Sequence, residues 1–186
     1  ADITIEKDIS DSVNFTIDAF GQMDILFNNA GYGTADNVAE ITKEQIDYGL
    51  GLLSSVILGI KYAVEPMKSI GGGCIINNSS VAAHVYGQGS PLYSALKSAV
   101  SHYTRMAGVS LGPFNIRVNA IAPSLVEWEE FPGKENRKKN KKTLKREKKE
   151  VTEAEKFESW LTGPENIPLG RVATFDEMAN AAVFLA

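Results

Sequence analysis

Short apolar runs alternate with long amphipathic stretches along the chain, a pattern typical of strands alternating with helices. An apolar run that is too short for a helix and bounded by turn residues indicates a buried strand; such runs cover residues 24–27, 74–77 and 116–121. This alternation predicts an α/β fold, a doubly wound parallel sheet with helices on both faces. No internal repeat interrupts the pattern, so we expect residues 1–186 to form a single domain.

Two capping boxes and one proline mark where helices begin. Thr42 with Gln45 and Thr174 with Glu177 have the spacing in which each side chain bonds the other residue's backbone. Pro91 is a residue that a first helical turn allows. The predicted helices cover residues 42–69, 91–111, 174–186 and, after a basic stretch, 151–161. In the first of them, apolar residues recur at steps of three and four and form one stripe: Ile46, Leu50, Leu53, Ile57, Ile60 and Val64.

The N-terminal residues carry a shorter pattern of the same kind. Ile3 and Ile5 alternate with polar residues, which predicts a strand that ends at Asp8. Ser10 is then expected to cap a helix that continues to Phe20. An N-cap role is equally open to Asp8, because its carboxylate can accept from the same backbone groups.

Composition excludes several classes of protein. The chain has 186 residues with Cys 1 and His 2, too few for an internal disulfide or a structural zinc site, so we expect no metal and a reducing compartment, the cytoplasm. No basic start followed by an apolar core indicates a secretory signal. Residues 69–96 carry no formal charge, yet Gly, Asn, Ser and Pro recur among them too densely for a membrane helix.

Charge is unevenly distributed. Residues 134–150 hold 10 Lys or Arg and 3 Glu, a local charge of +7, so the rest of the chain carries −11. We interpret residues 132–150 as a basic insertion in a loop, and a solvated, mobile loop is the simplest reading of such a run. It could also meet an anionic partner. The run contains no aromatic residue that could stack on a base, so we do not expect a nucleic-acid partner.

Candidate chemistry lies where ligands bind in open parallel sheets, beyond the carboxyl ends of the strands. Tyr93 and Lys97 are four residues apart on a predicted helix and therefore project from one face. A nearby ammonium favours the phenolate by Coulomb attraction, which makes the pair a candidate acid/base couple. Ser80 lies 13 residues before Tyr93, at the end of the preceding strand, where its hydroxyl could reach the same point.

Six segments in one order resemble the short-chain dehydrogenase/reductase family. They are Asp8-Ile9, NNAG at residues 28–31, IINNSS ending in Ser80, YSALK at residues 93–97, IRVNAIAP at residues 116–123, and PLGRVATFDEMANAAVFLA at the end. Together they cover nearly all of the chain except the basic insertion. The resemblance implies a Rossmann-type fold and a partial dinucleotide-binding domain.

The resemblance also implies an activity, the transfer of a hydride between a nicotinamide cofactor and an alcohol or ketone. In that reading Tyr93 gives or takes the hydroxyl proton, and Ser80 hydrogen-bonds the substrate oxygen. Lys97 binds the ribose beside the nicotinamide. Outside this family context, Ser80 would be a capping hydroxyl, and Tyr93 with Lys97 a surface pair.

The cofactor implied by the resemblance is NAD or NADP, and the segment that would choose between them is missing from the sequence. The residues assigned to the cofactor are Asp8, Ile9, Asn28, Ala30, Gly31, Lys97, Pro123 and Val126. Asp8 matches the position that hydrogen-bonds the adenine amino group. The small residues of 28–31 let the backbone approach the adenosine ribose.

The sequence departs from the family at several positions. The glycine-rich phosphate loop is absent, so we expect a chain truncated at both ends whose first strand lacks its neighbours, with residues 1–10 unpaired or added to another edge. Leu52 stands where the family has an asparagine that holds a water of the proton relay. Ser124 replaces the glycine after Pro123, and Trp128 replaces a threonine that contacts the carboxamide.

Two functions are therefore weighed against each other. One is an oxidoreductase acting on a small alcohol or carbonyl compound, whose identity residues 125–162 do not disclose. The other is a non-catalytic homologue or fragment that serves as an oligomerising scaffold. In both, the helices over residues 42–69 and 91–111 carry more apolar surface than one sheet needs, so we expect a homodimer or homotetramer.

Overall fold

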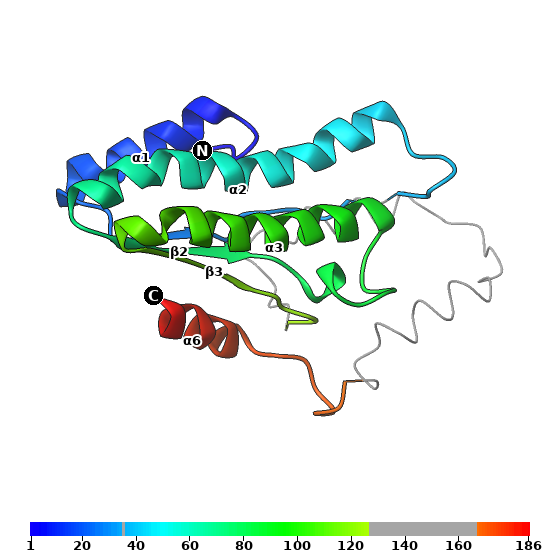
Figure 1. Ribbon diagram of the computed structural model, residues 1–186. Helices are drawn as coiled ribbons and strands as arrows, with labels where there is room; N and C mark the ends of the chain where they lie inside the picture. The colour runs from blue at the N-terminus through cyan, green and yellow to red at the C-terminus, as the bar shows by residue number, and fades with distance from the viewer. Residues whose placement is uncertain (35, 127–166) are drawn as a thin grey trace, which may run out of the picture.

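The structure is a computed structural model that describes residues 1–34, 36–126 and 167–186 (Figure 1). Within these residues lies a parallel sheet of β1 (Ile25–Asn28), β2 (Gly73–Asn78) and β3 (Ile116–Ile121), in the order β1-β2-β3. All three strands were predicted, and each observed strand lies within one residue of the expected bounds. The carboxyl ends of the strands point the same way, so the residues that follow them meet at one edge.

Helices cover both faces of the sheet. The helices α2 (Lys43–Ser69) and α3 (Pro91–Leu111) lie on one face, and α6 (Phe175–Leu185) lies on the other (Figure 1). The helix α1 (Glu6–Phe20) packs against α2, and two short 3-10 helices, η1 (Val81–Ala83) and η2 (Gly112–Phe114), flank α3. The predicted α/β class with helices on both faces is confirmed.

Local signals determine where the helices begin. Thr42 and Thr174 each form a complete capping box, with Gln45 and Glu177 respectively. Ser90 caps α3, its Oγ accepting from the amide of Tyr93 at 3.4 Å. These caps satisfy amides that a helix start leaves unpaired. The sequence predicted the starts of α2 and α6 from their capping boxes and the start of α3 from Pro91.

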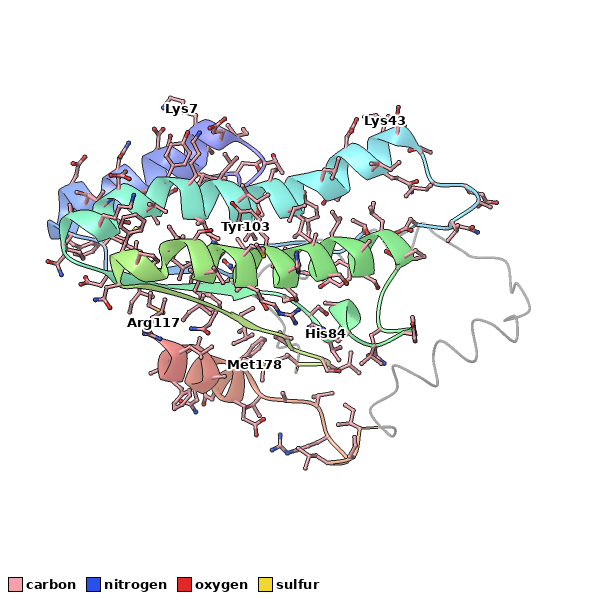
Figure 2. The ribbon with its side chains drawn as sticks, in the orientation of Figure 1. Lys7, Lys43, His84, Tyr103, Arg117 and Met178 are labelled. Carbon is pink, nitrogen blue, oxygen red and sulfur yellow. The ribbon has the colours of Figure 1, made fainter. Side chains whose placement is uncertain are left out.

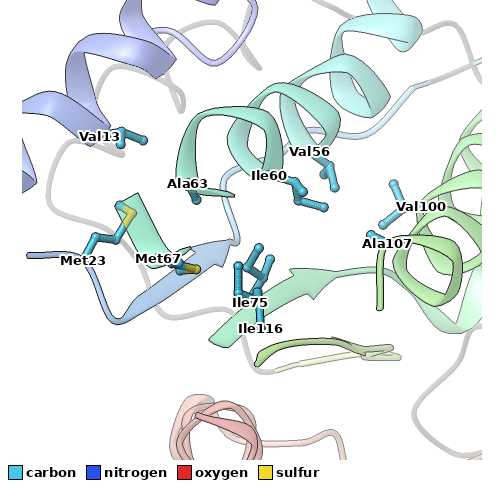
Figure 3. Close-up of a cluster of buried hydrophobic side chains, with 10 residues drawn as sticks. All are labelled: Val13, Met23, Val56, Ile60, Ala63, Met67, Ile75, Val100, Ala107 and Ile116. Atoms are coloured by element: carbon cyan, nitrogen blue, oxygen red, sulfur yellow. The ribbon is translucent and has the colours of Figure 1, made fainter. Parts of the chain in front are cut away.

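The main core lies between the sheet and the helices α1, α2 and α3. Its buried side chains are Val13, Met23, Val56, Ile60, Ala63, Met67, Ile75, Val100, Ala107 and Ile116 (Figure 3). Among the described helices, α2 alone has the length and apolar composition of a membrane span. Its buried residues are part of this core, and a core helix can have the same length and apolar composition.

Polar side chains connect the strands to α3 within this core. The Asn28 amide donates to Asn77 Oδ1 at 2.8 Å, and the Asn77 amide donates to Thr104 Oγ1 at 2.9 Å. Asn28 and Asn77 are also paired in the β1–β2 register. Buried amides need partners, so this chain of hydrogen bonds determines which residues can lie opposite each other.

The predicted N-terminal strand does not form. Residues 1–5 pair with no strand, and α1 already begins at Glu6, so Asp8 lies in the first helical turn. The cap position is Ile5 with no side-chain cap, while the Ser10 hydroxyl donates to the Lys7 carbonyl. A strand needs a neighbour for its backbone hydrogen bonds, and here the carboxylates of Asp2 and Asp8 bond nearby amides instead.

Several sequence predictions lie outside the described residues. They concern the basic insertion at residues 132–150, the helix over residues 151–161 and the indole of Trp128. The extent of the domain also stays a prediction.

Candidate active site

A cleft of about 330 Å³ lies at the carboxyl ends of the strands, beside the start of α3. Five of the residues that line it were predicted from the sequence: Gly31, Ser80, Tyr93, Lys97 and Pro123. They come from the loops after all three strands and from the first two turns of α3. The fold thus brings the three candidate catalytic side chains to one concave site.

Lys97 is held firmly at the floor of this cleft. Its Nζ donates to the backbone carbonyl of Asn78 at 2.7 Å and lies 5.6 Å from the centroid of the Tyr93 ring. The residue is 6% exposed. Burial disfavours the ammonium and lowers the pKa of Lys97 to about 8. A cation so placed can act on groups in the cleft with little screening by water.

Ser80 is positioned by its neighbour Ser79. The Ser79 amide donates to the carbonyl of Ile121 at 2.8 Å, and its hydroxyl donates to the carbonyl of Lys97 at 3.1 Å. Ser79 is thereby bonded to both β3 and α3. The Ser80 hydroxyl itself accepts from the amide of Ala82 at 3.1 Å and caps η1. The capping role suggested for Ser80 is therefore real, and it coexists with a place in the cleft.

A second hydroxyl contact lies below this loop. Ser79 Oγ is 2.6 Å from Ser101 Oγ, which is 3.5 Å from His84 Nε2. Figure 2 shows His84 beside η1, the short helix that follows Ser80. These buried contacts attach the Ser79–Ser80 segment to the middle of α3 and limit its movement.

A second cleft of about 330 Å³ lies between α1 and β1. It brings together four of the predicted cofactor residues, Asp8, Ile9, Asn28 and Ala30. Asn29 lines both this cleft and the one that contains Tyr93. The predicted cofactor residues in this cleft and the predicted catalytic residues in the cleft with Tyr93 therefore lie on either side of Asn29, which directly follows β1.

Val126 is the predicted site residue that neither of these clefts includes. It forms an isolated parallel bridge with Ala173, whose amide donates to the carbonyl of Leu125 at 3.1 Å. The bridge joins the segment after β3 to the segment before α6. In this structure Val126 has a backbone role at that junction.

Leu52, which the resemblance matches to an asparagine of the family, is 2% exposed and packs beside Gly31. A Cβ added at Gly31 would lie 3.1 Å from Leu52 Cδ1, so the missing side chain of Gly31 is what leaves room for the leucine. An apolar side chain cannot hold a water molecule by hydrogen bonds. At this position the structure has an apolar contact between Leu52 and Gly31.

The loop after β1 is attached to the start of α3. The Asp36 carboxylate accepts from the amide of Leu92 at 3.1 and 3.3 Å, and the Ser90 hydroxyl donates to the carbonyl of Thr34 at 2.9 Å. A carboxylate at a helix N-terminus is favoured by the helix dipole. These bonds set the position of the turn that carries Tyr93.

The predicted site residues leave out several polar residues that line the cleft with Tyr93, among them Asn29, Tyr32, Asn78 and Ser79. Asn29 and Asn78 stand inside the quoted motifs, and the amide of Asn78 donates to Asn29 Oδ1 at 2.9 Å. The available signal was the pair of consecutive asparagines at the end of an otherwise apolar strand. Successive side chains of a strand point to opposite faces, so the pair places a polar group on each face of the sheet.

Comparison with known proteins agrees with this geometry. The family model described as enoyl-(acyl carrier protein) reductase matches residues 1–186. An uncharacterized oxidoreductase of Schizosaccharomyces pombe is 31% identical over 191 residues, which cover 100% of this chain and 66% of the relative. The chain therefore belongs to the short-chain dehydrogenase/reductase family.

Other relatives have named activities. A cyclopentanol dehydrogenase of Comamonas testosteroni is 36% identical over 126 residues, 67% of this chain and 50% of the relative. The L-sorbose reductase of Gluconobacter frateurii, solved with NADPH and L-sorbose, superimposes with a TM-score of 0.77 at 27% identity, covering 100% of this chain and 67% of that chain. The present chain spans about half to two thirds of the length of these relatives.

Proposed function

We propose that the protein is an NAD(P)-dependent oxidoreductase that transfers a hydride between a nicotinamide cofactor and a small alcohol or ketone. The observation that carries the proposal is the meeting of Ser80, Tyr93 and the buried Lys97 in one cleft at the carboxyl ends of the strands. Relatives named as cyclopentanol dehydrogenase and L-sorbose reductase support this reaction class.

The roles of the three side chains follow from their chemistry. Tyr93 exchanges the hydroxyl proton with the substrate, because its phenol can both give and take a proton. Ser80 donates a hydrogen bond to the substrate oxygen. The Lys97 ammonium, 5.6 Å from the centroid of the Tyr93 ring, donates to the ribose of the cofactor. The bound cofactor supplies or accepts the hydride.

The cofactor fits the arrangement of the clefts. Its nicotinamide ribose would lie with Gly31, Lys97 and Pro123, and its adenosine with Asp8 and the start of the loop after β1. Asn29, which lines both clefts, would lie along the path between the two halves. The buried donor Lys97 and a buried acceptor in the same cleft are the polar groups that a ribose requires.

Replacing Tyr93 by Phe tests the proposed function. We expect binding of NADH or NADPH, followed by protein fluorescence, to stay within about twofold, while turnover falls by about 10²-fold or more. Cyclopentanol and L-sorbose are the first substrates to assay. A loss of this size is expected because the variant retains the ring but has no proton to exchange.

Tyr103→Phe provides the matched control. Tyr103 lies on the same helix and packs against the core (Figure 2), so the same change there should leave turnover within about twofold. Equal turnover in the two variants would contradict the role of Tyr93. If neither cofactor binds the wild-type protein up to millimolar concentration, the scaffold alternative is favoured instead.

A further inference from the structure

Asn78, the last residue of β2, carries a polar atom that nothing in the described structure satisfies. Its Oδ1 is buried and accepts no hydrogen bond from any described residue, and no other buried side-chain oxygen or nitrogen there is in this position. A buried acceptor without a donor costs free energy, so such an atom calls for an explanation. The residue lines the cleft that contains Tyr93 and Lys97.

The remaining polar groups of Asn78 are already engaged. Its side-chain nitrogen donates to Asn29 Oδ1 at 2.9 Å, and its backbone carbonyl accepts from Lys97 Nζ at 2.7 Å. In this orientation of the two amides, the oxygen of Asn78 is the end that has no donor. The second bond places the Lys97 ammonium next to the backbone of the same residue.

The neighbouring Asn77 is fully buried and shows what a structural asparagine looks like in this strand. Both ends of its amide are bonded, the oxygen to Asn28 and the nitrogen to Thr104. Successive strand residues face opposite sides of the sheet, so Asn77 points to the α3 side and Asn78 to the other side. Packing alone therefore explains the first asparagine and leaves the oxygen of the second unexplained.

A ligand hydroxyl can pair with the Lys97 ammonium and with Asn78 Oδ1 at the same time. An ammonium only donates hydrogen bonds and an amide oxygen only accepts them, whereas a hydroxyl does both. We propose that Asn78 is a cofactor-positioning residue, its Oδ1 accepting a hydrogen bond from a hydroxyl of the nicotinamide ribose that Lys97 also holds. This role rests on the proposed function, since it requires a nicotinamide cofactor in the cleft.

Asn78→Leu, which preserves the side-chain volume and removes both polar groups, tests this role. We expect the Kd for NADH or NADPH to rise about tenfold, the size of one lost hydrogen bond to a buried acceptor. The Kd for AMP, which lacks the nicotinamide ribose, should stay within about twofold. The melting temperature without ligand should stay within about 2 °C, because removal of the unpaired acceptor offsets loss of the bond to Asn29 Oδ1.

A cofactor analogue whose nicotinamide-side ribose lacks its 2′ and 3′ hydroxyls provides the second arm. It should bind wild type and Asn78→Leu with the same Kd, since the proposed bond is missing in both. Asn78→Ala repeats the comparison with a smaller side chain, in case leucine disturbs the fold.

Two results would overturn the role of Asn78. One is an unchanged Kd for the natural cofactor in both variants. The other is a fall in melting temperature together with an equal loss of AMP binding, which would mark Asn78 as a structural residue. If the wild-type protein binds neither NADH nor NADPH, both the proposed function and the role of Asn78 are contradicted. If the variants bind the cofactor as tightly as wild type does, only the role of Asn78 is contradicted.

Discussion

At the scale of single residues, Lys97 shows that the site is built at a cost to the ligand-free protein. The long side chain is buried, and its ammonium donates to the backbone carbonyl of Asn78 at 2.7 Å. Burial holds its pKa near 8, below the ordinary value of 10.5, so the folded protein disfavours the charged form. The Lys97 ammonium nevertheless lies next to the Tyr93 ring and lines the cleft in which a ligand would bind.

This burial predicts a pH-dependent difference between wild type and Lys97→Met. Between about pH 8 and pH 10.5 the unfolded chain binds a proton at Lys97 that the folded chain does not, so wild-type stability rises with pH in that window. The variant lacks the group. Urea unfolding at about pH 7.5 and about pH 10 should show wild type gaining stability relative to Lys97→Met. A constant difference between the two proteins would count against the low pKa.

At the scale of elements, close contacts between helix and strand depend on glycines. A Cβ at Gly59 of α2 would collide with Asn28 Oδ1, and the Asn28 amide is the outer end of the hydrogen bonds that pass through Asn77 to Thr104. The missing side chain thus lets α2 approach the sheet over the Asn28–Asn77 pair.

Gly59→Ala should therefore destabilise the protein, although alanine favours a helix over glycine by about 1 kcal/mol. We expect the free energy of unfolding to fall by about 1–3 kcal/mol, because Asn28 must move and its buried bond to Asn77 is strained. Gly108→Ala in α3 is the control, since its Cβ would lie an ordinary 3.4 Å from the nearest atom. Urea unfolding of both variants decides the matter; a stabilised Gly59→Ala protein would rule out this account.

What the sequence could predict depends on how local the signal is. The starts of α2 and α6 were predictable from capping boxes such as Thr42 with Gln45, and that of α3 from Pro91, because these signals lie within one turn. The strand expected at Ile3 and Ile5 failed because alternation says nothing about whether a partner strand is available. Ser80, Tyr93 and Lys97 were proposed from their spacing and from the family resemblance, and the structure brings them into one cleft. The unpaired oxygen of Asn78 was not, because hydrogen-bond satisfaction is a property of the folded molecule.

At the scale of the whole molecule, apolar side chains remain on the outer faces of the helices. Val109 of α3 is 76% exposed and Met106, three residues before it, is 51% exposed, so the two share one face. We propose that the protein forms a homodimer or homotetramer through α2 and α3, which would cover such a surface.

Val109→Glu should weaken this assembly, because pairing would then bury an unpartnered carboxylate. Light scattering at micromolar concentration is expected to give a dimer or tetramer for wild type and a smaller mean mass for the variant. Phe15→Glu on α1, where the side chain is 70% exposed, is the control and should leave the mass unchanged. A wild-type monomer would end the proposal.

The pairing of β1 with β2 also bears on how the chain reaches this fold. Asn28 and Asn77 are 49 positions apart, so their contact closes a long loop whose lost entropy precedes any gain from the sheet. Helix α2 lies within this loop, and its Gly59 lies against Asn28. We therefore expect docking of α2 and pairing of β1 with β2 to be coupled, because both place Asn28 against a partner.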